Sequence, residues 1–429
     1  MVVNLVLISQ SVFGSFRIAL KDKNCMKVNR IEQQIIKRTN LIWEIVDKYS
    51  YRAKNVYNYA NYIIRKEFIN NDKWIRAYDL QKICKDADCY KELGSQAAQK
   101  TIQVLDQNWK SFFKSIKDWK KHPDKYLGMP KLPKYLDKDG RTTFYLKNTQ
   151  CSLKDGVFRI SFKPFGGYSV NTHAYGKLMQ CRFVPRGEDY ILEIVYEIDV
   201  PDIDDSFMSK RIASIDLGVS NLMTVTTNCN IEPFAVNGNP LKSINQFYNK
   251  ELARIKSDLK TKHNADWSKT LQKMTTKRNN KINDYIHKST TMVVNFCRDN
   301  DIDTLVCGLN KGWKQESDMN KKNNQNFVSI PHHSVIQKLE YKCENYGIKF
   351  ILTEEGYRSG TSFLDGEEPI KQNYDKSRRK PRGLFRANNG GVINSDVNGS
   401  YQIMKKVFPD VFSDGIEGVG LHPVRLNIV

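Results

Sequence analysis

The stretch Arg211 to Asn228, RIASIDLGVSNLMTVTTN, decides the fold of the second half of the chain. Ile212 to Ile215 have the apolar character of a buried strand, and Leu222 to Thr227 form a second such run. Asp216 ends the first strand, and Gly218 follows in a predicted turn. The pattern predicts a hairpin that holds a carboxylate on rigid backbone, where a metal ion or a phosphate can approach. A lone Asp-x-Gly triplet is more often a plain turn, so its meaning depends on the rest of the chain.

The composition is that of a globular and strongly basic protein. Of 429 residues, 40% are hydrophobic and 11% aromatic, which is enough for two or three domains with proper cores. The 68 Lys and Arg residues outnumber the 47 Asp and Glu residues and give a formal net charge of +21. Because such an excess repels itself unless a polyanion neutralises it, nucleic acid is the expected partner, with a merely soluble basic protein as the alternative.

The cysteines and the apolar runs indicate the compartment. Nine cysteines are scattered without a Cys-x-x-Cys pair, which is typical of reduced thiols in the cytoplasm rather than of disulfides or a zinc site. The start, MVVNLVLISQSVFGS, has no basic residue before its short apolar run and is a poor signal peptide. No run reaches the roughly 20 apolar residues of a membrane span, so we expect no membrane partner.

The first 205 residues divide into a helical and a β-rich part. After two candidate strands, Phe16 to Lys21 and Val28 to Lys37, apolar residues recur every three or four positions from Asn40 to Asp118, which predicts helices. Prolines in Lys120 to Lys134 end the helices, and short β segments follow as a small barrel or sheet, which strands near the N-terminus could complete. These segments are Arg141 to Leu146, Val157 to Phe162, Leu178 to Pro185 and Asp189 to Tyr196.

Polar and basic residues between the apolar positions of the helical part are expected on its outward face. This face is solvated by default and binds nucleic acid if the charge argument holds. The candidates for nucleic-acid contact are Arg52, Lys54, Tyr57 and Asn61. Trp109 is a further candidate, although packing in the core explains it equally well.

The second half has the strand and helix order of a ribonuclease-H-like domain. A three-stranded meander that ends with Ile231 to Asn237 precedes two long helices, Ser243 to Lys262 and Trp267 to Arg298. A buried strand, Thr304 to Cys307, is followed by a helix, a strand and a last helix, at His333 to Tyr346, Ile348 to Thr353 and Asn398 to Val407. In such a mixed sheet the later strands run parallel to the first, and we expect a site at the carboxyl ends of the first, fourth and fifth strands.

A second carboxylate, Asp396, lies directly before the last predicted helix, between Asn394 and Asn398. Asp is also a common helix N-cap, so the position alone leaves both interpretations open. Together, Asp216 and Asp396 supply the hard oxygen ligands with which a two-metal nuclease holds Mg²⁺, orients a water and neutralises the leaving oxygen. The pair therefore predicts a nuclease site with two Mg²⁺ ions.

Three segments of the second half resemble the TnpB family, RNA-guided nucleases that are encoded by insertion sequences and related to compact type V CRISPR effectors. They are IDLGVSN, KGWKQESDMNKKNNQNFVSIPHHSVIQKLEYKCENYGI and RGLFRANNGGVINSDVNGS. The segments YRAKNVYNYANYIIR and SQAAQKTIQVLDQNWKSFFKSIK also look like the helical recognition lobe of that family. The resemblance covers the chain from about Val28, and its motifs are specific in combination.

The resemblance implies an α+β multidomain architecture, with a wedge-type β-barrel, an inserted helical recognition lobe and a RuvC-like α/β nuclease domain. It implies an N-terminal segment with the first barrel strands at 1–39, the lobe at 40–120, the barrel at 121–205, the nuclease domain at 206–355 and 392–429, and a basic insert at 356–391. The implied activity is Mg²⁺-dependent cleavage of double-stranded DNA that pairs with a guide RNA beside a short target-adjacent motif. The implied location is the prokaryotic cytoplasm, at the nucleoid.

The third carboxylate of the family pattern is displaced in this sequence. Gly308 stands where relatives usually carry a catalytic Glu after the fourth strand. Glu354 and Glu355 follow the fifth strand, at the same predicted edge as Asp216, and some branches of the family resemble this arrangement. We prefer Glu355, and expect it to bind metal with Asp216 and Asp396. If both glutamates are surface acids, the nuclease is inactive.

The insert at 356–391 lacks the four cysteines that bind zinc in many relatives, so no zinc is expected. Its basic residues predict either a phosphate-binding loop or a solvated basic loop. The candidate nucleic-acid contacts of the second half are Lys277 and Arg278 in the second long helix, Lys314, and Arg378, Arg379, Arg382 and Arg386 in the insert.

Three functions fit the sequence. An RNA-guided DNA endonuclease explains the carboxylates, the charge and the resemblance together. A nuclease-inactive RNA-guided DNA-binding repressor is the alternative if the third carboxylate is missing. A guide-independent ribonuclease-H-like transposase or resolvase would share the nuclease fold but would not explain the helical lobe and the barrel.

Overall fold

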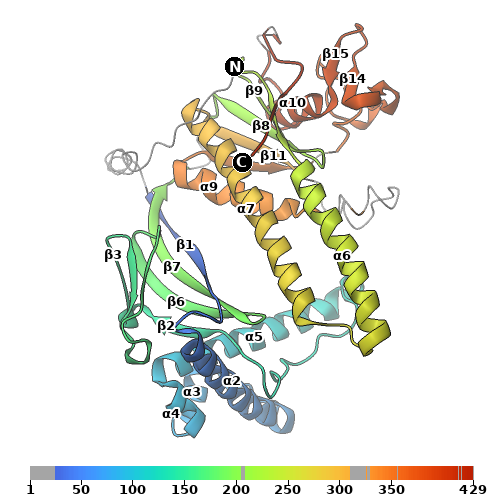
Figure 1. Cartoon of the computed structure of the whole chain (residues 1–429). Helices are drawn as coiled ribbons and strands as arrows, with labels where there is room; N and C mark the ends of the chain where they lie inside the picture. Colours follow the sequence, from blue (N-terminus) through green and yellow to red (C-terminus); the bar gives the residue numbers. More distant parts are fainter. Residues whose placement is uncertain are drawn as a thin grey trace. The chain divides into compact units, whose positions relative to one another are not determined.

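The computed structural model describes residues 25–203, 208–309, 325, 329–354, 356–413, 415, 416 and 418–428. These residues form two compact units. Residues 27–199 are called here the N-terminal unit, and the residues from 200 onward, together with residues 25 and 26, are called the C-terminal unit. Figure 1 traces the chain through both. The strand predicted at Phe16 to Lys21 lies outside the described residues. The finer domain boundaries inferred from the sequence stay predictions.

The N-terminal unit contains the predicted helices. They are α2 (Trp43–Asn71), α3 (Ala77–Cys84), α4 (Asp88–Leu93) and α5 (Ser95–Lys121). The apolar positions of α2 and α5 face each other, and Trp109 is fully buried with its ring edge against Phe68. Trp109 is therefore a core residue, as packing alone predicts.

The strands of the N-terminal unit form two sheets. A four-stranded sheet has the order β1 (Cys25–Ile36), β7 (Asp189–Pro201), β6 (Lys177–Arg186), β2 (Phe144–Lys147). A three-stranded sheet consists of β3 (Cys151–Lys154), β4 (Val157–Ile160) and β5 (Ser169–Asn171). Because β1 lies beside β7, the expectation that an N-terminal strand completes the later sheet is confirmed.

The C-terminal unit is built on one mixed six-stranded sheet. Its order is β12 (Lys349–Thr353), β11 (Thr304–Gly308), β8 (Ile212–Leu217), β9 (Asn221–Thr227), β10 (Phe234–Asn237), β16 (Val424–Leu426). Strands β8, β9 and β10 are antiparallel, whereas β11 and β12 run parallel to β8. The predicted strand directions are confirmed, and the carboxyl ends of β8, β11 and β12 meet at one edge.

Helices cover both faces of this sheet. Apolar residues of α7 (Lys269–Asp299) and α9 (His332–Tyr346) pack with Ile215 and Cys307 on one face. On the other face, Ile403 and Met404 of α10 (Ser395–Val407) pack with Ile212 and Val306. Successive residues of a strand point to opposite faces, so Asp216 lies on the α10 face.

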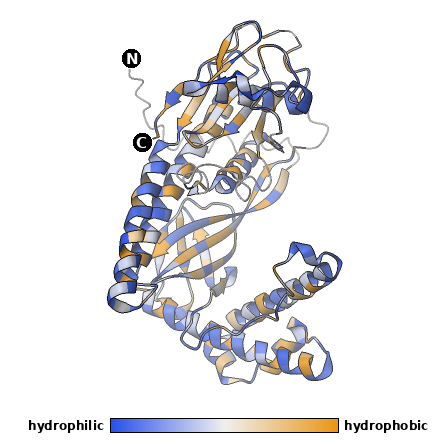
Figure 2. Ribbon diagram, turned by 90° about the vertical axis from the view of Figure 1, so that its right-hand side faces the viewer, coloured by the Kyte–Doolittle hydropathy of each residue, from blue (hydrophilic) through white to orange (hydrophobic). Residues whose placement is uncertain are grey.

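Two long helices of the C-terminal unit, α6 (Asn239–His263) and α7, carry many basic residues. Helix α6 packs on α7, where the Tyr248 and Thr275 hydroxyls lie 3.0 Å apart. Figure 2 shows hydrophilic residues recurring along their whole length. Of the helices in the part of the chain that the structure describes, none is long and apolar enough to cross a membrane. The nine cysteines all lie among the described residues and form no disulfide there.

The predicted basic insert folds against α10. It contains a small sheet of β13 (Arg379–Lys380), β14 (Leu384–Arg386) and β15 (Val392–Asn394). Phe363 and Phe385 are buried in a core with Tyr401 of α10, and the Phe363 and Tyr401 rings stack at 4.3 Å. The segment is therefore a small folded module.

Candidate active site

Asp216 lies at the carboxyl end of β8 and is buried. It pairs with Thr224 of the neighbouring strand, so its backbone is fixed within the hairpin. The turn then closes through the Gly218 N–H, which donates to the Leu222 carbonyl at 3.2 Å. A Cβ on Gly218 would lie 2.5 Å from the Asn221 carbonyl oxygen, so only glycine fits this turn. The predicted hairpin and its strand-end carboxylate are both observed.

His332 supports the turn from outside the hairpin. Its Nε2–H donates to the Gly218 carbonyl at 3.0 Å, and the side chain is buried at the start of α9. Because a carbonyl oxygen can only accept, this contact assigns the Nε2-protonated tautomer. Helix α9 thereby anchors the backbone that follows Asp216.

Small residues bring α10 close to β8 beside Asp216. The Ser400 hydroxyl donates to the Ser214 carbonyl at 2.9 Å, and the Ser214 hydroxyl donates to the Ser400 carbonyl at 2.7 Å. The neighbouring Gly399 has no side chain, and a Cβ there would lie 2.7 Å from Asp216 Oδ2. The helix can approach the carboxylate only because this position is glycine.

Asp396 lies in the first turn of α10, because the helix begins at Ser395, before the predicted start at Asn398. The N-cap is Asn394, whose side-chain oxygen accepts from the Asp396 and Val397 N–H groups at 3.0 and 3.2 Å. The Asp396 carboxylate is not the cap, and its Oδ2 accepts from Asn221 Nδ2 at 2.8 Å. The N-cap interpretation of Asp396 is therefore wrong, and its side chain lies at the hairpin that carries Asp216.

A guanidinium group binds Asp216. Arg358 Nη1 lies 2.5 Å from Asp216 Oδ1, and the two side chains are only 13% and 10% exposed. Arg358 follows β12 in a turn whose next residues are tied to α10. Asn398 donates to the Thr361 carbonyl at 2.8 Å and accepts from the Phe363 N–H at 2.9 Å.

None of the described residues supplies a third carboxylate to Asp216 and Asp396. Gly308 and Thr353 are register neighbours at the ends of β11 and β12, level with Asp216. Glu354 is exposed directly after β12, and Glu355 lies outside the described residues. Within the residues that the structure describes, no group of three or more His, Cys, Asp or Glu side chains could hold a metal ion.

The donor set nevertheless suits a hard divalent cation. Asp216 and Asp396 offer carboxylate oxygens, the ligands that Mg²⁺ prefers. The arginine on Asp216 shows that this carboxylate already binds a cation at short range. The space above Gly399 would be filled by a Cβ at any other residue. These residues fit two of the three carboxylates of a metal site.

The predicted basic contacts of the C-terminal unit divide into exposed and internal residues. Lys277, Arg379 and Arg386 are exposed. Arg278 is half-buried between α6 and α7, where its Nε donates to Asn245 Oδ1 at 2.8 Å, and burial lowers its pKa. Lys314 and the side chain of Arg382 lie outside the described part of the chain.

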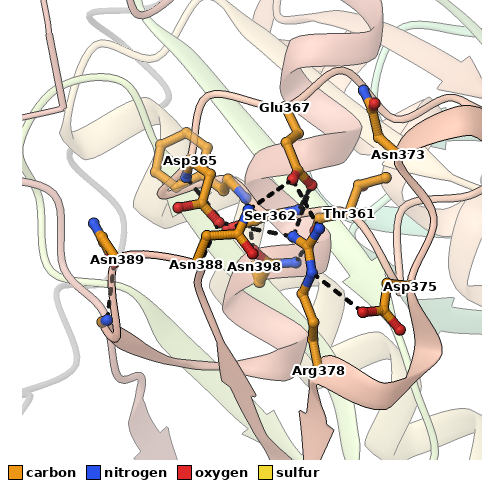
Figure 3. Close-up of polar contacts among 12 residues, drawn as sticks. Thr361, Ser362, Asp365, Glu367, Asn373, Asp375, Arg378, Asn388, Asn389 and Asn398 are labelled. Atoms are coloured by element: carbon orange, nitrogen blue, oxygen red, sulfur yellow. Dashed lines mark hydrogen bonds and ion pairs between the residues drawn. The ribbon is translucent and has the colours of Figure 1, made fainter.

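Arg378 is an internal residue of the folded module (Figure 3). Its two terminal nitrogens donate to the two Glu367 oxygens, each at 2.9 Å, and Asp365 and Asp375 lie at 3.7 Å. The hydrogen bond to Glu367 raises the Arg378 pKa, against the effect of burial. Arg378 therefore has intramolecular partners where a phosphate contact was predicted.

The acids around Arg378 are held in their charged form. Burial works to raise the pKa of Asp365, but hydrogen bonds from Asn388, Ser362 and Asn389 and the nearby Arg378 charge lower it below the ordinary value. Hydrogen bonds from Ser377 likewise lower the pKa of Asp375. Asp365 and Asp375 therefore stay ionised beside the Arg378 charge at neutral pH.

The helical part of the N-terminal unit corrects several predictions. Lys54, Tyr57 and Asn61 are buried, so their predicted outward position is wrong. Lys54 Nζ donates to the Lys138 carbonyl at 2.6 Å, and Asn61 accepts from Trp109 Nε1 at 3.1 Å. The segment around Pro133 covers this face and accepts from Asn61 Nδ2, also at 3.1 Å.

Two further predicted contacts of this unit are also bonded within it. Arg52 Nη1 donates to the Glu92 carbonyl at 3.0 Å. The Tyr57 hydroxyl accepts from Asn108 Nδ2 at 3.1 Å. These bonds join α2 to α4 and α5, which gives both residues a structural role.

Four residues of the site were missed in the sequence. They are Asn221, His332, Arg358 and Gly399. Asn221 ends the quoted motif IDLGVSN and Gly399 lies in SDVNGS, so both were inside resembling segments. No sequence signal pairs Arg358 with Asp216, because the element order predicts that β12 and β8 end at the same edge but does not predict which side chains meet there.

Two family models match parts of the chain that contain residues of this site. The model OrfB_IS605, described as a probable transposase, matches residues 193–314, which include Asp216. The model of the Cas12f1-like TNB domain matches residues 332–403, which include Arg358, Asp396 and Gly399. These matches confirm the resemblance to the TnpB family.

Two solved structures match most of the chain. A structure of a Cas12f1-sgRNA-target DNA complex matches with a TM-score of 0.54 and 17% identity, over 84% of this chain and 82% of that chain. A CRISPR-Cas12f ternary complex matches at 17% identity over 84% and 81%, with a TM-score of 0.37. The first match shows a shared mixed α/β multidomain fold. No functionally curated protein matches the sequence.

Proposed function

We propose that this chain is an RNA-guided DNA endonuclease of the TnpB type, with a RuvC-like nuclease domain in its C-terminal unit. The observation that carries the proposal is the pair Asp216 and Asp396 at the carboxyl edge of the mixed sheet. The resemblance to the TnpB family and the net charge of +21 support a nucleic-acid substrate. The name of the similar Cas12f1-sgRNA-target DNA complex suggests a guide RNA and target DNA as partners.

The chemistry follows from where the carboxylates are held. Two bound Mg²⁺ ions would supply an activated water and neutralise charge on the attacking and leaving oxygens. Asp216 offers its carboxylate from rigid strand backbone, and Asn221 orients the Asp396 carboxylate by donating to Oδ2. Rigid backbone and hydrogen-bonded ligands keep such a site in its productive geometry.

Glu355 is our preferred third ligand. In β12, Ile351 and Thr353 pair with Val306 and Gly308 of β11. These positions lie on the face of the sheet that packs against α10. Glu354, the first residue after this strand, is exposed. We therefore assign Glu355 to the site and Glu354 to the surface.

Nucleic acid would be held mainly by its backbone. Exposed Lys277, Arg379 and Arg386 are suited to phosphate contacts, because cationic side chains on long stems bind phosphates without reading the sequence. Sequence would be read by pairing with the guide RNA beside a short flanking motif.

A cleavage assay tests the proposal. The full chain, loaded with the RNA that co-purifies with it, is incubated in Mg²⁺ with a target library whose flanking bases vary. We expect the wild type to cut, and Asp216→Ala, Asp396→Ala and Glu355→Ala to lose at least about 100-fold in rate, while Glu354→Ala cuts normally. If the wild type binds the guided target and leaves it intact, the endonuclease proposal fails.

A guided DNA-binding repressor is the second candidate. It is favoured by Gly308 at the usual glutamate position and by the absence of a third carboxylate among the residues that the structure describes. In that case the target is bound with guide-dependent specificity, and Asp216→Ala leaves the binding constant unchanged. Gel shifts run beside the cleavage assay separate the two functions.

A further inference from the structure

The contact between Arg358 and Asp216 lies inside the proposed metal site. Arg358 Nη1 is 2.5 Å from Asp216 Oδ1, and both side chains are largely shielded from water. In such surroundings desolvation offsets the attraction between the charges, but each partner is costly to leave unpaired. The contact therefore has to be counted when a cation binds Asp216.

The Arg358 guanidinium can lie beside Asp216 only because residue 399 is glycine. A Cβ at this position would lie 2.9 Å from Arg358 Nη1 as well as 2.7 Å from Asp216 Oδ2. Both distances are below any ordinary contact, so every other residue would displace the pair. Because Gly399 has no Cβ, the guanidinium can lie directly against the carboxylate.

Arginine and a divalent ion compete for this position. Mg²⁺ binds carboxylate oxygens at about 2.0 to 2.1 Å in near-octahedral geometry. A guanidinium nitrogen hydrogen-bonded to the same carboxylate would lie beside the ion, in surroundings where like charges repel strongly. Ion and arginine therefore exclude each other at Asp216 Oδ1.

The segment that carries Arg358 has a strained backbone. Tyr357, directly before it, has φ of 64° without being glycine, a conformation that a bulky residue adopts only at a cost. Its half-exposed ring meets the Tyr374 ring edge-on at 6.0 Å, and both rings lie at the surface. From Thr361 onward the chain is tied to α10 by Asn398, so movement of Arg358 needs a change only in the turn that carries it.

We propose that Arg358 is an internal stand-in for the metal, which neutralises Asp216 in the metal-free protein and is displaced when a divalent cation binds. This inference rests on the proposed function, because it concerns the same site. Arg358 is a positioning residue that acts through Asp216. It keeps a buried carboxylate paired, and it weakens metal binding until the site is assembled with its substrate.

Binding of Mn²⁺ alone to the full chain tests this proposal. Free Mn²⁺ is measured by electron paramagnetic resonance for the wild type, Arg358→Gln and Arg254→Gln. Arg254 is an exposed arginine of α6 that pairs with Glu251 at 2.9 Å, so its variant changes the net charge equally, away from the site. We expect Arg358→Gln to bind Mn²⁺ about tenfold more tightly than the wild type, and Arg254→Gln to bind as the wild type does.

A melting experiment covers the case in which Arg358→Gln folds poorly. In EDTA its melting temperature should fall, because Asp216 is buried without its partner, and Mn²⁺ should restore it. Arg358→Lys, which keeps the charge on a more flexible stem, should bind Mn²⁺ with intermediate affinity.

The outcomes separate this inference from the proposed function. If Asp216→Asn abolishes Mn²⁺ binding to the wild type, but Arg358→Gln binds no more tightly, the stand-in role is overturned and the metal site remains. If Asp216→Asn binds Mn²⁺ as the wild type does, no metal uses Asp216, and the proposed nuclease site fails with it.

Discussion

Two arginines of the C-terminal unit bind buried carboxylates in opposite circumstances. Arg378 has three acidic neighbours, a two-pronged bond to Glu367 and a fixed place in the folded module. Arg358 binds Asp216 in the proposed metal site, next to a strained turn. The same pair of charges is a structural bond in the module and, on our proposal, an exchangeable one at Asp216.

The neighbours decide which role an arginine has. Around Arg378 the acids also accept from the Ser362 and Asn388 backbone N–H groups, at 2.7 and 2.8 Å, so the cluster is part of the module's own fold. Around Arg358, Gly399 supplies space and the α10 face supplies a second carboxylate. On our proposal, a second carboxylate that is not bound by the arginine favours exchange with a metal ion at Asp216.

Removing Arg378 should give the largest effect. Arg378→Met leaves Asp365 and Glu367 charged and largely buried, with side chains 12% and 16% exposed, so the module should lose about 3 to 5 kcal/mol. Hydrogen exchange of residues 361–386 measures this loss, and Mg²⁺ should not restore protection. Arg254→Met, which removes an exposed pair, is the control and should change stability by less than about 0.5 kcal/mol. Rescue of Arg378→Met by metal would break the distinction between the two arginines.

Adding a side chain at Gly399 of α10 should give the next largest effect. Gly399→Ala places a Cβ against Asp216 and Arg358, so either the helix or the ion pair must shift, at a cost of about 1 to 3 kcal/mol. Calorimetry should show a lower melting temperature and weaker Mn²⁺ binding. The control is Gly356→Ala, where the nearest atom to a new Cβ is the flexible Lys406 Nζ at 3.7 Å. Equal behaviour of the two variants would contradict the close approach of α10 to Asp216.

Asn221 should affect metal binding more than folding. Asn221→Ala removes the donor to Asp396 Oδ2, and loss of such a supporting bond weakens metal binding by about 10- to 100-fold. Mn²⁺ titration measures the change. Asn71→Ala, which removes an exposed carboxamide that donates to Glu67, should leave Mn²⁺ binding unaltered. An unaffected Asn221→Ala would show that Asp396 needs no orienting partner.

Acid should weaken the Arg378 cluster by a smaller amount. The pKa values of Asp365 and Asp375 are lowered in the fold, so their stabilising contribution is complete above the unfolded value of about 3.9 and is lost as the pH falls through the folded value. The difference in protection between the wild type and Arg378→Met should therefore be constant from pH 5 to pH 8, as rough limits, and shrink below about pH 4. A difference that varies across the neutral range would point to other groups.

The sequence predicts the parts that depend on local pattern. Apolar runs bounded by turns placed β8, β9, β11 and β12, and the order of the elements predicted their directions. Parallel strands end at one edge of the sheet, and the last helix, α10, was predicted to pack on that sheet. The approach of Asp396 to the Asp216 hairpin could therefore also be predicted. Neither step needs side-chain detail.

The errors arise where polar residues pair over long distances. Asn61 looked like a surface residue, yet it is buried because Trp109 and the segment at Pro133 satisfy its carboxamide. Asn221 and Asp396 are 175 positions apart, and nothing in either local sequence records their bond. Arg358 and Arg378 are both arginines of a basic region, and only their three-dimensional neighbours distinguish their roles.

The most direct test of the exchangeable arginine is a crystal of the full chain grown with Mn²⁺. Anomalous scattering locates the ion without reference to the protein coordinates. We predict an ion bound to the Asp216 and Asp396 carboxylates, Arg358 displaced from Asp216, and Arg378 still bonded to Glu367. A structure with Mn²⁺ elsewhere and Arg358 still paired with Asp216 would contradict the account.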